Sequence, residues 1–583
     1  MTLTAAPSAL ADTGAFTSAQ REALDAAIRE LAVGETAWAA MSLTERAALL
    51  ERTRESVATH ASEWATTASE IKGLDPHSQA VGEEWISGPY TILSGLAALA
   101  QSVRSLAAGT SPLAAIKFGS APGGRATLRV LPHNAYEAIL FHGFHAEVWM
   151  PPQVDAATAR AQAGLAQLQP TVTHGIGLVL GAGNITSIPP LDVLYELIAN
   201  NRVALLKLNP VMAKMEGVYG KALAPLIDAG VLRIVQGGGE AGGYLVHHKS
   251  IAHVHVTGSA ATHDAIVWGP GADGRARKAS GTPLLEKEIS SELGGVAPII
   301  VIPGQWTTSD LRFQAEHVVT MRLHNGGYNC IAGQLVILSK DWAQKDAFLT
   351  ELRAALERTP DRVAWYPGSD SRVASAAESY PAAEKLGSGS TRLLVDVTAA
   401  ETPETIKSTE YFSPVLGVIE LAGTGRQFFD DAIDTANRDL LGTLGANIIG
   451  DPKDIKKMGA GFRESLVALR YGTIAINAWT GVGFLSATAP FGAFPGHTLD
   501  DVQSGRGFVH NALLIREPER TVVRGPFRPF PRSFAHGEFA LFPKPPWFVT
   551  SRSAATTGRR LSAFAARPSV GRMVAVFLAA FRA

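Results

Sequence analysis

The stretch Asn325-Gly-Gly-Tyr-Asn-Cys330-Ile-Ala-Gly-Gln334 holds the only cysteine among the 583 residues of the chain. Polar and glycine residues precede Cys330, and the apolar run Leu335-Val-Ile-Leu338 follows it closely. A structural cysteine more often lies inside an apolar run, where it acts as a small buried side chain. This pattern instead predicts a loop that presents a thiol beside a strand, where backbone N–H groups can approach a reacting carbonyl.

A second motif supplies a carboxylate. Ser291-Glu292-Leu293-Gly294-Gly295 precedes the apolar run Val296-Ala-Pro-Ile-Ile-Val-Ile302, which is typical of a buried strand. An acidic side chain at the mouth of a strand can activate water, and the two glycines let a ligand or another chain approach the backbone. Together with Cys330, this motif resembles the aldehyde dehydrogenase superfamily. There the cysteine is the nucleophile and the glutamate of an E-L-G-G motif is the general base, which implies these roles for Cys330 and Glu292.

Length and composition limit the class of protein. A chain of 583 residues is too long for one simple core and suggests two or three domains. Its formal net charge of −1 gives no overall field that would attract nucleic acid. Residues 1–17 lack the basic start and apolar core of a secretory signal, and no stretch approaches the roughly 20 apolar residues that span a bilayer. We therefore expect a cytoplasmic enzyme with no nucleic-acid partner.

From Gly175 onward, short apolar runs alternate with helical stretches, which is typical of a parallel α/β sheet. Ligands of such sheets bind outside the carboxyl ends of the strands. Unusual residues fall at those ends, including Gly181-Ala-Gly-Asn184, Lys207 and Thr257-Gly-Ser259. The glycine signal is weak by itself, because Gly181 and Gly183 are not followed by the third glycine of the common dinucleotide fingerprint. The predicted strands are residues 177–180, 203–207, 232–235 and 252–256.

The order of these landmarks also resembles aldehyde dehydrogenases, which bind NAD or NADP in a variant Rossmann domain. The resemblance implies an α/β catalytic domain and a small oligomerisation element beside it. It also implies that the Asn184 amide helps form an oxyanion hole and that Lys207 reaches the adenosine ribose. Gly258 and Ser259 match the segment at the pyrophosphate, and Leu293 is expected to contact the cofactor. A homodimer or homotetramer acting on a small-molecule aldehyde is expected on the same ground.

Later landmarks follow in the family's order. Glu410-Tyr-Phe412-Ser-Pro414-Val415 resembles E-x-F-G-P-V, which assigns Glu410 to the nicotinamide ribose and Phe412 to the nicotinamide ring. Asn437-Arg-Asp-Leu-Leu-Gly442-Thr-Leu444 resembles N-x-x-x-Y-G-L, and Pro490-Phe491-Gly492 resembles the late P-F-G motif without the lysine and serine that usually follow. We expect N-terminal helices and the NAD(P)-binding domain in residues 1–285, the thiol domain in 286–480, and a completing segment in 481–583.

Cofactor preference depends on the residues after Lys207. Many NAD-preferring relatives carry a glutamate three residues after the lysine, where its charge repels the extra phosphate of NADP. This chain reads Lys207-Leu-Asn-Pro210, so the repulsion is absent. We expect use of NAD with tolerance of NADP.

The first half of the chain carries little other chemistry. Residues 18–110 are expected to be helical, with Leu49, Leu50 and Val57 on one face. In the strand-rich passage 125–152, His142, His145 and Glu147 lie close in sequence. A metal site needs a defined ligand set with supporting contacts, so no metal is predicted.

The last stretch departs from the family. From Ala540 onward the chain has Lys544 and six arginines but no Asp or Glu, and it ends in Met573-Val-Ala-Val-Phe-Leu-Ala-Ala-Phe581. These nine apolar residues cannot cross a membrane, but a basic amphipathic tail can lie on one. Two interpretations stay open: peripheral contact with the inner face of a membrane, or a tail packed over the protein or a partner subunit.

These residues permit aldehyde oxidation. A free aldehyde has no sp³ carbon from which hydride can leave, so the thiolate of Cys330 must first form a thiohemiacetal. The amide of Asn184 and the backbone N–H of Cys330 would stabilise the alkoxide, and Glu292 would activate water to hydrolyse the thioester. A CoA-acylating or phosphorylating relative, a non-catalytic binding protein and a cysteine hydrolase are the alternatives. The aromatic residues that suggest an apolar substrate tunnel are Tyr328, Trp479, Phe484 and Phe491.

Overall fold

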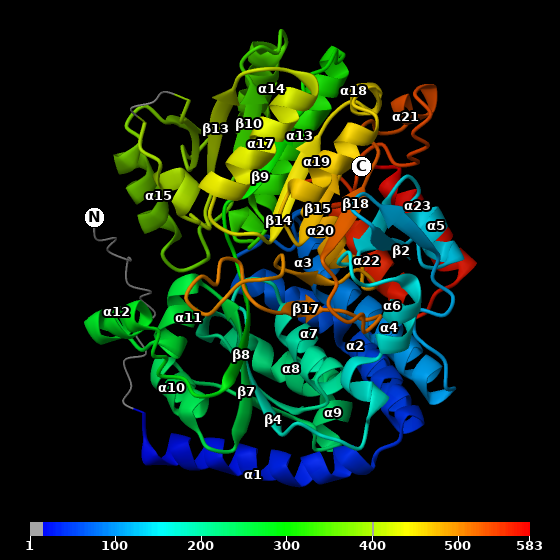
Figure 1. Cartoon of the computed structure of the whole chain (residues 1–583), viewed down its shortest axis with the longest axis vertical. Coiled ribbons are helices and arrows are strands. Elements are labelled where there is room, and N and C mark those ends of the chain that lie inside the picture. The colour runs from blue at the N-terminus through cyan, green and yellow to red at the C-terminus, as the bar shows by residue number, and fades with distance from the viewer. Residues whose placement is uncertain (1–15, 399–401) are drawn as a thin grey trace.

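Two large β-sheets organise the chain and occupy the lower and upper halves of Figure 1. The computed structural model describes residues 16–398 and 402–583. The five-stranded sheet has the order β6 (Leu232–Val235), β5 (Val203–Lys207), β4 (Ile176–Leu180), β7 (Ile251–Gly258), β8 (Glu288–Leu293). The eleven-stranded sheet has the order β1 (Phe118–Ala121), β2 (Arg125–Leu131), β3 (His145–Trp149), β18 (Arg520–Arg524), β15 (Thr473–Ile476), β14 (Gly445–Ile449), β9 (Ala297–Val301), β10 (Gly333–Ser339), β13 (Val415–Leu421), β12 (Arg392–Asp396), β11 (Glu384–Leu386). A separate pair is β16 (Phe491–Gly492) and β17 (Phe508–His510).

Helices cover both sheets (Figure 1). Those before the second sheet are α1 (Ser18–Ala40), α2 (Leu43–Ile71), α3 (Val81–Trp85), α4 (Thr91–Ala107), α5 (Ala135–Leu140), α6 (Ala156–Gln162), α7 (Ile188–Leu194), α8 (Glu216–Ala222), α9 (Ala224–Asp228), α10 (Gly239–His247), α11 (Ala260–Val267) and α12 (Gly271–Ser280). Those that follow are α13 (Thr308–Leu323), α14 (Lys345–Arg358), α15 (Ser369–Ser379), α16 (Thr405–Ser408), α17 (Gly425–Asp439), α18 (Pro452–Lys457), α19 (Ala460–Ala468), α20 (Thr480–Leu485), α21 (Arg532–Ala535), α22 (Ala554–Ala566) and α23 (Val570–Ala580). Short 3₁₀ or π segments are η1 (Ile86–Tyr90), η2 (Leu165–Leu168), η3 (Tyr195–Ala199), η4 (Pro210–Met215) and η5 (His324–Gly327).

The five-stranded sheet is parallel throughout, as the alternation of apolar runs and helices predicted. All five residues of β5 are buried, because helices cover both faces of the sheet. The pairs Leu180 with Lys207 and Gly258 with Leu293 stand opposite each other at the carboxyl ends of their strands. These ends therefore form one edge, where ligands of such sheets bind. The predicted α/β fold is confirmed.

The two sheets are joined directly by the link from β8 to β9. β8 ends at Leu293, and β9 begins at Ala297 in the other sheet. β9 pairs in parallel with β10, and Gly333 stands opposite Ala297. This register brings the turn before β10 next to the end of β8. Cys330 and Glu292, far apart in sequence, are neighbours for this reason.

The expected boundaries at residues 285 and 480 need correction. β8 lies beyond residue 285 yet pairs with β7 of the five-stranded sheet. β1 to β3 lie in the first 285 residues but belong to the eleven-stranded sheet, in which β3 pairs with β18. The chain therefore crosses between the two parts several times. Apolar runs identify such strands, but long-range pairing decides which sheet they join.

The N-terminal helices and the tail pack together. α2 begins with a capping box between Ser42 and Glu45, and the predicted apolar face of Leu49, Leu50 and Val57 is buried. α22 packs against α2, α3, α4 and η1. A Cβ at Gly82 would lie 2.3 Å from the backbone of Ala554, so this contact requires glycine. The interpretation of a tail packed over the protein's own surface therefore holds for α22. No helix in residues 16–398 and 402–583 is long and apolar enough to cross a membrane.

Candidate active site

Cys330 lies in the turn between η5 and β10. Asn325, Gly326 and Gly327 have φ angles of 56°, 70° and 86°. Glycine adopts this left-handed region without strain, and asparagine does so more readily than most residues. A Cβ at Gly327 would also come within 3.1 Å of the Arg322 guanidinium. The Asn-Gly-Gly sequence therefore permits the tight turn that leads to Cys330.

Buried charges from the N-terminal helices hold this turn. The ammonium of Lys72 donates to Oδ1 of Asn325 at 2.9 Å and pairs with Glu84 at 2.8 Å. The backbone N–H of Asn325 donates to Glu83 at 2.8 Å, and Glu83 also accepts from Arg362 at 2.9 Å. Lys72, Glu83, Glu84 and Asn325 are all buried. The position of the turn at residues 325–330 thus depends on residues at the end of α2 and in α3. Sequence reasoning missed these residues because no motif connects them to the turn.

The thiol of Cys330 and the carboxyl group of Glu292 share surroundings that disfavour charge. Burial and the nearby carboxyl groups of Glu292 and Glu410 raise the pKa of the Cys330 thiol well above its ordinary value. Burial, and then the charge of Asp192, raises the pKa of Glu292 to about 8, although contact with the thiol opposes this rise. Both groups therefore favour their protonated forms near neutral pH, and the Glu292 carboxyl group loses its proton more readily than the thiol.

Glu292 is held on β8 by backbone from both sides. It stands opposite Thr257 of β7, and it forms an antiparallel bridge with Gly505. The segment around Gly505 comes so close that a Cβ there would lie 2.2 Å from the carbonyl oxygen of Ser291. The φ of Gly505 is 117°, which also favours glycine. Glu292 is 1% exposed, and neither of its carboxyl oxygens has a hydrogen-bond partner among the described residues.

An apolar cavity, here called the thiol cavity, lies beside Cys330 and measures about 440 Å³ when the open space at its mouth is included. Asn184 lines it, and its side-chain N–H₂ donates to the carbonyl oxygen of Tyr328 at 2.9 Å. An amide nitrogen carries two hydrogens, so one hydrogen remains for an oxyanion in the cavity. Further lining residues are Ile185, Ile188, Trp479, Phe484 and Phe491.

The tunnel prediction holds for three of its four aromatic residues, because Trp479, Phe484 and Phe491 line the thiol cavity. Tyr328 does not line it. The Tyr328 ring stacks on Tyr366 with centroids 5.6 Å apart, and its hydroxyl lies 2.8 Å from the Ser369 hydroxyl. The prediction for Tyr328 was wrong because its backbone carbonyl, not its ring, faces Asn184.

Glu410 lies against the Gly294-Gly295 link between the sheets. A Cβ at Gly294 would come within 1.8 Å of a Glu410 carboxyl oxygen, so glycine makes room for this side chain. Burial raises the pKa of Glu410 to about 8, although Arg322 and Arg372 favour its charged form. Phe412 lies two residues further on, with its ring 4.9 Å from that of Tyr366. Glu410 therefore shares the Cys330 surroundings.

A buried polar network behind Glu292 was not predicted. The hydroxyl of Thr257 donates to Asp192 at 3.0 Å, and His255 lies 3.3 Å from the same carboxyl group. The other ring nitrogen of His255 lies 2.8 Å from the Ser290 hydroxyl. Burial opposes a charge on His255, but the Asp192 carboxylate raises the pKa of the imidazole. The available signal was the presence of two histidines, His253 and His255, within a buried strand.

The predicted cofactor contacts Lys207, Gly258 and Leu293 lie at the carboxyl edge of the five-stranded sheet. Ser259 is the N-cap of α11, and its hydroxyl accepts from the Thr262 N–H at 3.1 Å. Gly258 is exposed, and a Cβ built on it would meet only a Val256 methyl at 3.7 Å. An open glycine before a helix N-terminus fits a pyrophosphate, because both leave backbone N–H groups accessible to an anion.

Within the part of the chain that the structure describes, no three His, Cys, Asp or Glu side chains form a group able to hold a metal ion. A nitrogen of the His145 ring lies 3.0 Å from the Arg129 guanidinium, and Glu147 lies 3.9 Å from Arg463. His142 lines a different cavity. These three residues, which lie close in sequence, therefore face different partners.

Comparison with known proteins agrees with this arrangement. Residues 193–363, which include Lys207, Glu292 and Cys330, match the model of the Aldehyde dehydrogenase family. N-succinylglutamate 5-semialdehyde dehydrogenase of Novosphingobium aromaticivorans is 28% identical over 324 residues, which cover 50% of this chain and 62% of the relative. The enzyme of that name from Ectopseudomonas mendocina is 28% identical over 346 residues, which cover 55% of this chain and 63% of the relative. The matches thus span less than two thirds of these relatives' own length.

Solved structures extend the likeness to most of the chain. Gamma-glutamyl-gamma-aminobutyraldehyde dehydrogenase from Burkholderia cenocepacia aligns with a TM-score of 0.57 and 19% identity, covering 86% of this chain and 87% of that one. Aldehyde dehydrogenase C from Pseudomonas syringae, solved with NAD+ and octanal, aligns with a TM-score of 0.54 and 18% identity, covering 87% and 90%. The chain has the aldehyde dehydrogenase fold. The resemblance predicted from Cys330, Glu292 and the ordered landmarks is confirmed.

Proposed function

We propose that the protein oxidises an aldehyde to a carboxylic acid with NAD or NADP. The observation that carries this proposal is the pairing of Cys330, the only thiol, with Glu292 beside an apolar cavity that Asn184 also lines. Such a cavity admits a neutral carbonyl compound and excludes most water. The proposed chemistry needs one nucleophile, one base and hydrogen-bond donors for an alkoxide.

The first step is proton transfer followed by addition. The Glu292 carboxylate takes the proton from the Cys330 thiol, because the raised pKa of the thiol makes its ionisation without a base infrequent. The thiolate sulfur then bonds to the aldehyde carbon, and the carbonyl oxygen becomes an alkoxide. The free amide hydrogen of Asn184 and the backbone N–H of Cys330 are the proposed donors to this alkoxide, which can contribute several kcal/mol.

The residues at the sheet edge fit the dinucleotide. Gly258 and Ser259 would face its pyrophosphate. Lys207 would reach the adenosine ribose, and Leu293 would also contact the cofactor. Glu410 and Phe412 would face the nicotinamide half. When bound, NAD or NADP supplies the acceptor for the hydride that leaves the thiohemiacetal carbon. Loss of this hydride turns the adduct on Cys330 into a thioester.

Hydrolysis completes the reaction. Glu292 first releases the thiol proton to solvent and becomes a carboxylate again. A water molecule then attacks the thioester carbonyl, and its proton passes to the Glu292 carboxylate. The sulfur leaves as the Cys330 thiolate, and the products are the carboxylic acid and the reduced cofactor. The position of Glu292 favours hydrolysis over acyl transfer to CoA, since a base in the cavity is what water requires. The presence of both the Cys330 thiol and the Glu292 carboxyl group argues against a non-catalytic relative.

The Glu292→Gln variant tests this proposal, because glutamine cannot accept the proton of the attacking water. We expect at most about one equivalent of reduced cofactor per chain, formed more slowly than in the wild type because Cys330 must ionise without this base, followed by a stall with the acyl group on Cys330. Mass spectrometry of the stalled protein identifies the adduct. The Cys330→Ala variant is the matched control, which should bind cofactor but produce no burst and no adduct. Steady turnover by Glu292→Gln at the wild-type rate would refute the role of this residue.

We also propose that the outer face of the tail contacts an anionic membrane surface. Seven of the twelve exposed large apolar residues of the described chain gather on and around α23, namely Ile139, Phe534, Phe539, Val570, Val574, Leu578 and Phe581. Val570, Val574, Leu578 and Phe581 follow helical spacing along one face. Exposed arginines at 567, 572 and 582 flank this apolar face and complement acidic lipid headgroups.

Vesicles of phosphatidylcholine with phosphatidylglycerol test the membrane proposal. Val574→Ser with Leu578→Ser should reduce cosedimentation of the protein at least about tenfold, because both side chains would otherwise enter the interface. Val33→Ser, an exposed valine on α1, is the control. Equal cosedimentation of all three proteins would refute the proposal.

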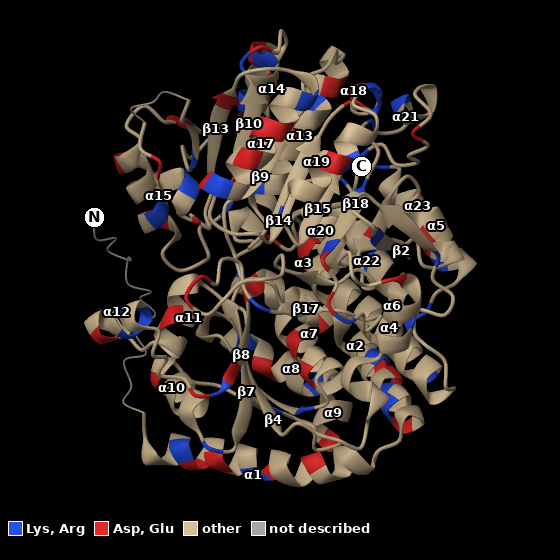
Figure 2. Ribbon diagram, viewed as in Figure 1, with Lys and Arg blue, Asp and Glu red and all other residues tan. Residues whose placement is uncertain are grey.

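A homodimer or homotetramer is proposed from the family resemblance alone. Lys and Arg alternate with Asp and Glu over much of the ribbon (Figure 2), so like-charge repulsion does not oppose self-association. Light scattering after size-exclusion chromatography measures the state directly. A monomer at micromolar concentration would contradict the proposal.

A further inference from the structure

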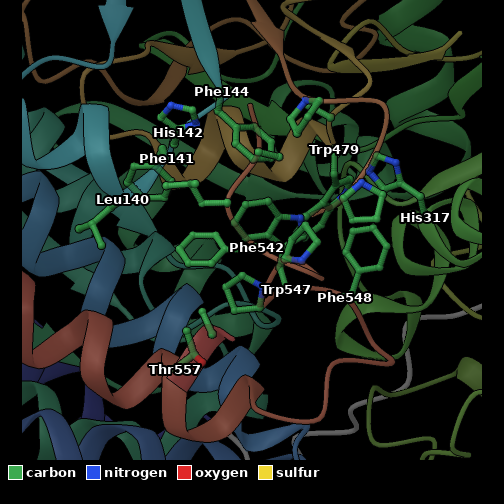
Figure 3. A pocket seen from close by; sticks show the side chains of 18 of the residues that line it. Leu140, Phe141, His142, Phe144, His317, Trp479, Phe542, Trp547, Phe548 and Thr557 are labelled. Carbon is green, nitrogen blue, oxygen red and sulfur yellow. The ribbon is translucent and has the colours of Figure 1, made fainter. Parts of the chain in front are cut away.

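A second apolar cavity adjoins the thiol cavity and is closed by the tail. It encloses about 770 Å³, including the space at its mouth, and we call it the tail pocket. Figure 3 shows the aromatic side chains that line it, with Leu140 and Trp479 on opposite sides of the view. Its walls come from the loop after α5, from α13 and from the tail after Ala540. The main contributors are Phe141, Phe144, His317, Phe542, Trp547 and Val576.

Trp479 is the wall that the two cavities share. Its chain neighbours divide between them, because Asn477 and Ala478 line the tail pocket and Gly481 lines the thiol cavity. The Trp479 ring lies 4.5 Å from that of His324. Its indole N–H is buried and has no hydrogen-bond partner among the described residues. Trp479 is thus a lining residue of both cavities, and no hydrogen bond within the described residues fixes its side chain.

The walls of the tail pocket offer no free charge. His317 lines it, and burial lowers the pKa of this imidazole to about 3, so the ring is neutral. His317 stacks on Phe548 with centroids 5.1 Å apart, and the Trp547 ring meets Phe144 edge-on at 5.5 Å. Such a lining selects uncharged, apolar ligands, because a charged group would lose its hydration without gaining a partner.

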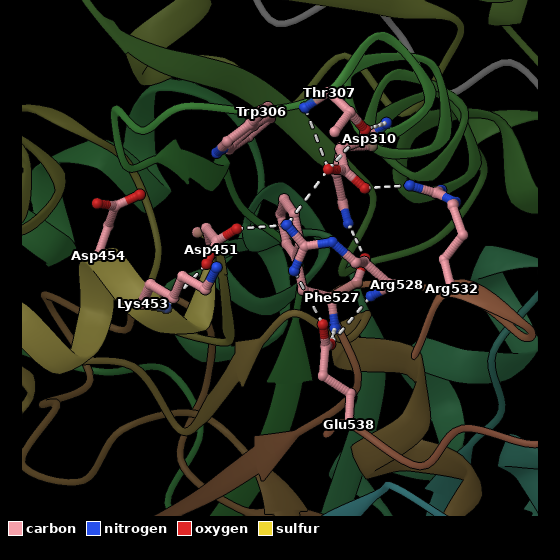
Figure 4. A network of polar contacts seen from close by, with 12 residues as sticks. Trp306, Thr307, Asp310, Asp451, Lys453, Asp454, Phe527, Arg528, Arg532 and Glu538 are labelled. Carbon is pink, nitrogen blue, oxygen red and sulfur yellow. Dashed lines mark hydrogen bonds and ion pairs between the residues drawn. The ribbon is translucent and has the colours of Figure 1, made fainter. Parts of the chain in front are cut away.

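Arg528 is the one lining residue with a permanent charge, and carboxylates surround it (Figure 4). Its guanidinium lies 3.2 Å from Asp310 and 3.0 Å from Glu538, and it also pairs with Asp451. Asp310 pairs in turn with Arg532. The network joins α13 to the segment before the tail, so it builds a wall of the pocket instead of attracting an anion.

We propose that the tail pocket holds the far end of the substrate, so that the preferred substrates are aldehydes with a long, unbranched alkyl chain. The carbonyl would lie at Cys330 in the thiol cavity, and the chain would pass Trp479 into the tail pocket. This inference rests on the proposed aldehyde oxidation. It adds a substrate class that the fold does not specify, because the tail that closes the pocket departs from the family pattern.

Straight-chain aldehydes from propanal to dodecanal test the proposal. Each methylene that leaves water for an apolar wall should raise kcat/KM about three- to fourfold. We expect dodecanal to exceed hexanal by at least about tenfold, a conservative fraction of that gain. Ala580→Trp fills the tail pocket, since Ala580 lines it and is buried. In this variant the ratio of kcat/KM for dodecanal to that for propanal should fall at least about tenfold.

Ala563→Trp is the matched control, because Ala563 lies on α22 with its side chain exposed. Its dodecanal-to-propanal ratio should equal that of the wild type. An unchanged ratio in Ala580→Trp, or equal kcat/KM for hexanal and dodecanal, would overturn the proposal. If Ala580→Trp does not fold, Phe542→Ala replaces it, and this enlargement should shift the optimum to longer chains; an unshifted optimum would overturn the proposal.

A binding measurement separates this inference from the proposed reaction. Calorimetric titration of 1-dodecanol into folded Cys330→Ala protein requires neither cofactor nor turnover. We expect micromolar binding that the additional Ala580→Trp change weakens at least about tenfold, whereas Ala563→Trp leaves it unchanged. Absence of oxidation of every aldehyde in the series together with dodecanol binding would refute the proposed reaction but support the pocket. Propanal oxidation without dodecanol binding would refute the pocket alone.

Discussion

Replacing Lys72 by methionine should loosen the turn at residues 325–330 without altering any residue that lines the thiol cavity. The change preserves most of the side-chain volume but removes the ammonium that pairs with Glu84 at 2.8 Å and donates to Asn325 at 2.9 Å. Lys72 is 1% exposed and Glu84 is fully buried, so the remaining carboxylate would have neither water nor a partner cation. Removing one member of such a pair costs about 3–5 kcal/mol.

The double variant Lys72→Met with Glu84→Leu separates two contributions to this cost. It removes the unpaired charge, but Oδ1 of Asn325 still lacks a donor, which costs about 1–3 kcal/mol. We therefore expect the double variant to be more stable than the single one. The opposite order would refute the electrostatic explanation and would indicate that the lysine acts through packing.

Hydrogen exchange measured by mass spectrometry gives a local readout for a chain too large for a two-state unfolding analysis. If the turn opens locally, a cost of about 3–5 kcal/mol speeds exchange of its amides by about a hundred- to a few thousand-fold, since each 1.4 kcal/mol is a factor of ten. A peptide from β5 serves as the internal control and should not change. Exchange in residues 325–330 within about threefold of wild type would refute the reasoning.

Further predictions concern the Glu292 carboxyl group and the cofactor. Because the pKa of Glu292 is raised to about 8 and only its carboxylate accepts protons, kcat should increase with pH up to about 8 and level off above; a flat profile between pH 6 and 8 would contradict this. Asp192→Asn removes a negative charge that raises this pKa, so the rise should move to lower pH, whereas Asp25→Asn on α1 should leave the profile unchanged. Because the folded-state pKa of Glu292 is raised to about 8, the protein loses stability as pH rises from the ordinary glutamate pKa to about 8, so Glu292→Gln should melt higher than wild type at pH 9 but not at pH 5. Pro210 stands three residues after Lys207, so the preference for NAD over NADP should stay below about a hundredfold, or 2.7 kcal/mol; kcat/KM for each cofactor measures it.

The sequence predicts those parts of the site that depend on local chemistry. Asn325-Gly-Gly before Cys330 indicates a turn because few other residues tolerate three consecutive left-handed φ angles, and the structure has this turn. Gly294-Gly295 indicates a close approach, and Glu410 is the group that approaches. The parts that sequence does not predict depend on contacts between distant segments. Nothing near Lys72 indicates that it donates to Asn325, 253 positions away.

The same limit applies to the tail. Its composition indicates a basic and apolar segment, but composition cannot distinguish a surface that faces lipid from one that closes a cavity. The structure shows that α23 has two different faces, since Val576 lines the tail pocket while Val574 is exposed, and contact of the exposed face with lipid is the proposal made above. Tyr328 illustrates a related error, because a residue beside a nucleophile can direct its ring away from the substrate.

The position of β18 between β3 and β15 has a consequence for the order of folding. Residues 145–149 pair only with β2 until residues 520–524 arrive, so the hairpin formed early in synthesis has an open edge. β15 likewise has an open edge on that side until β18 inserts. Pairings between such distant segments form slowly, and unpaired edges promote aggregation. A ribosome that stalls before residue 520 would therefore leave two exposed strand edges, and such truncated chains are expected to need chaperones.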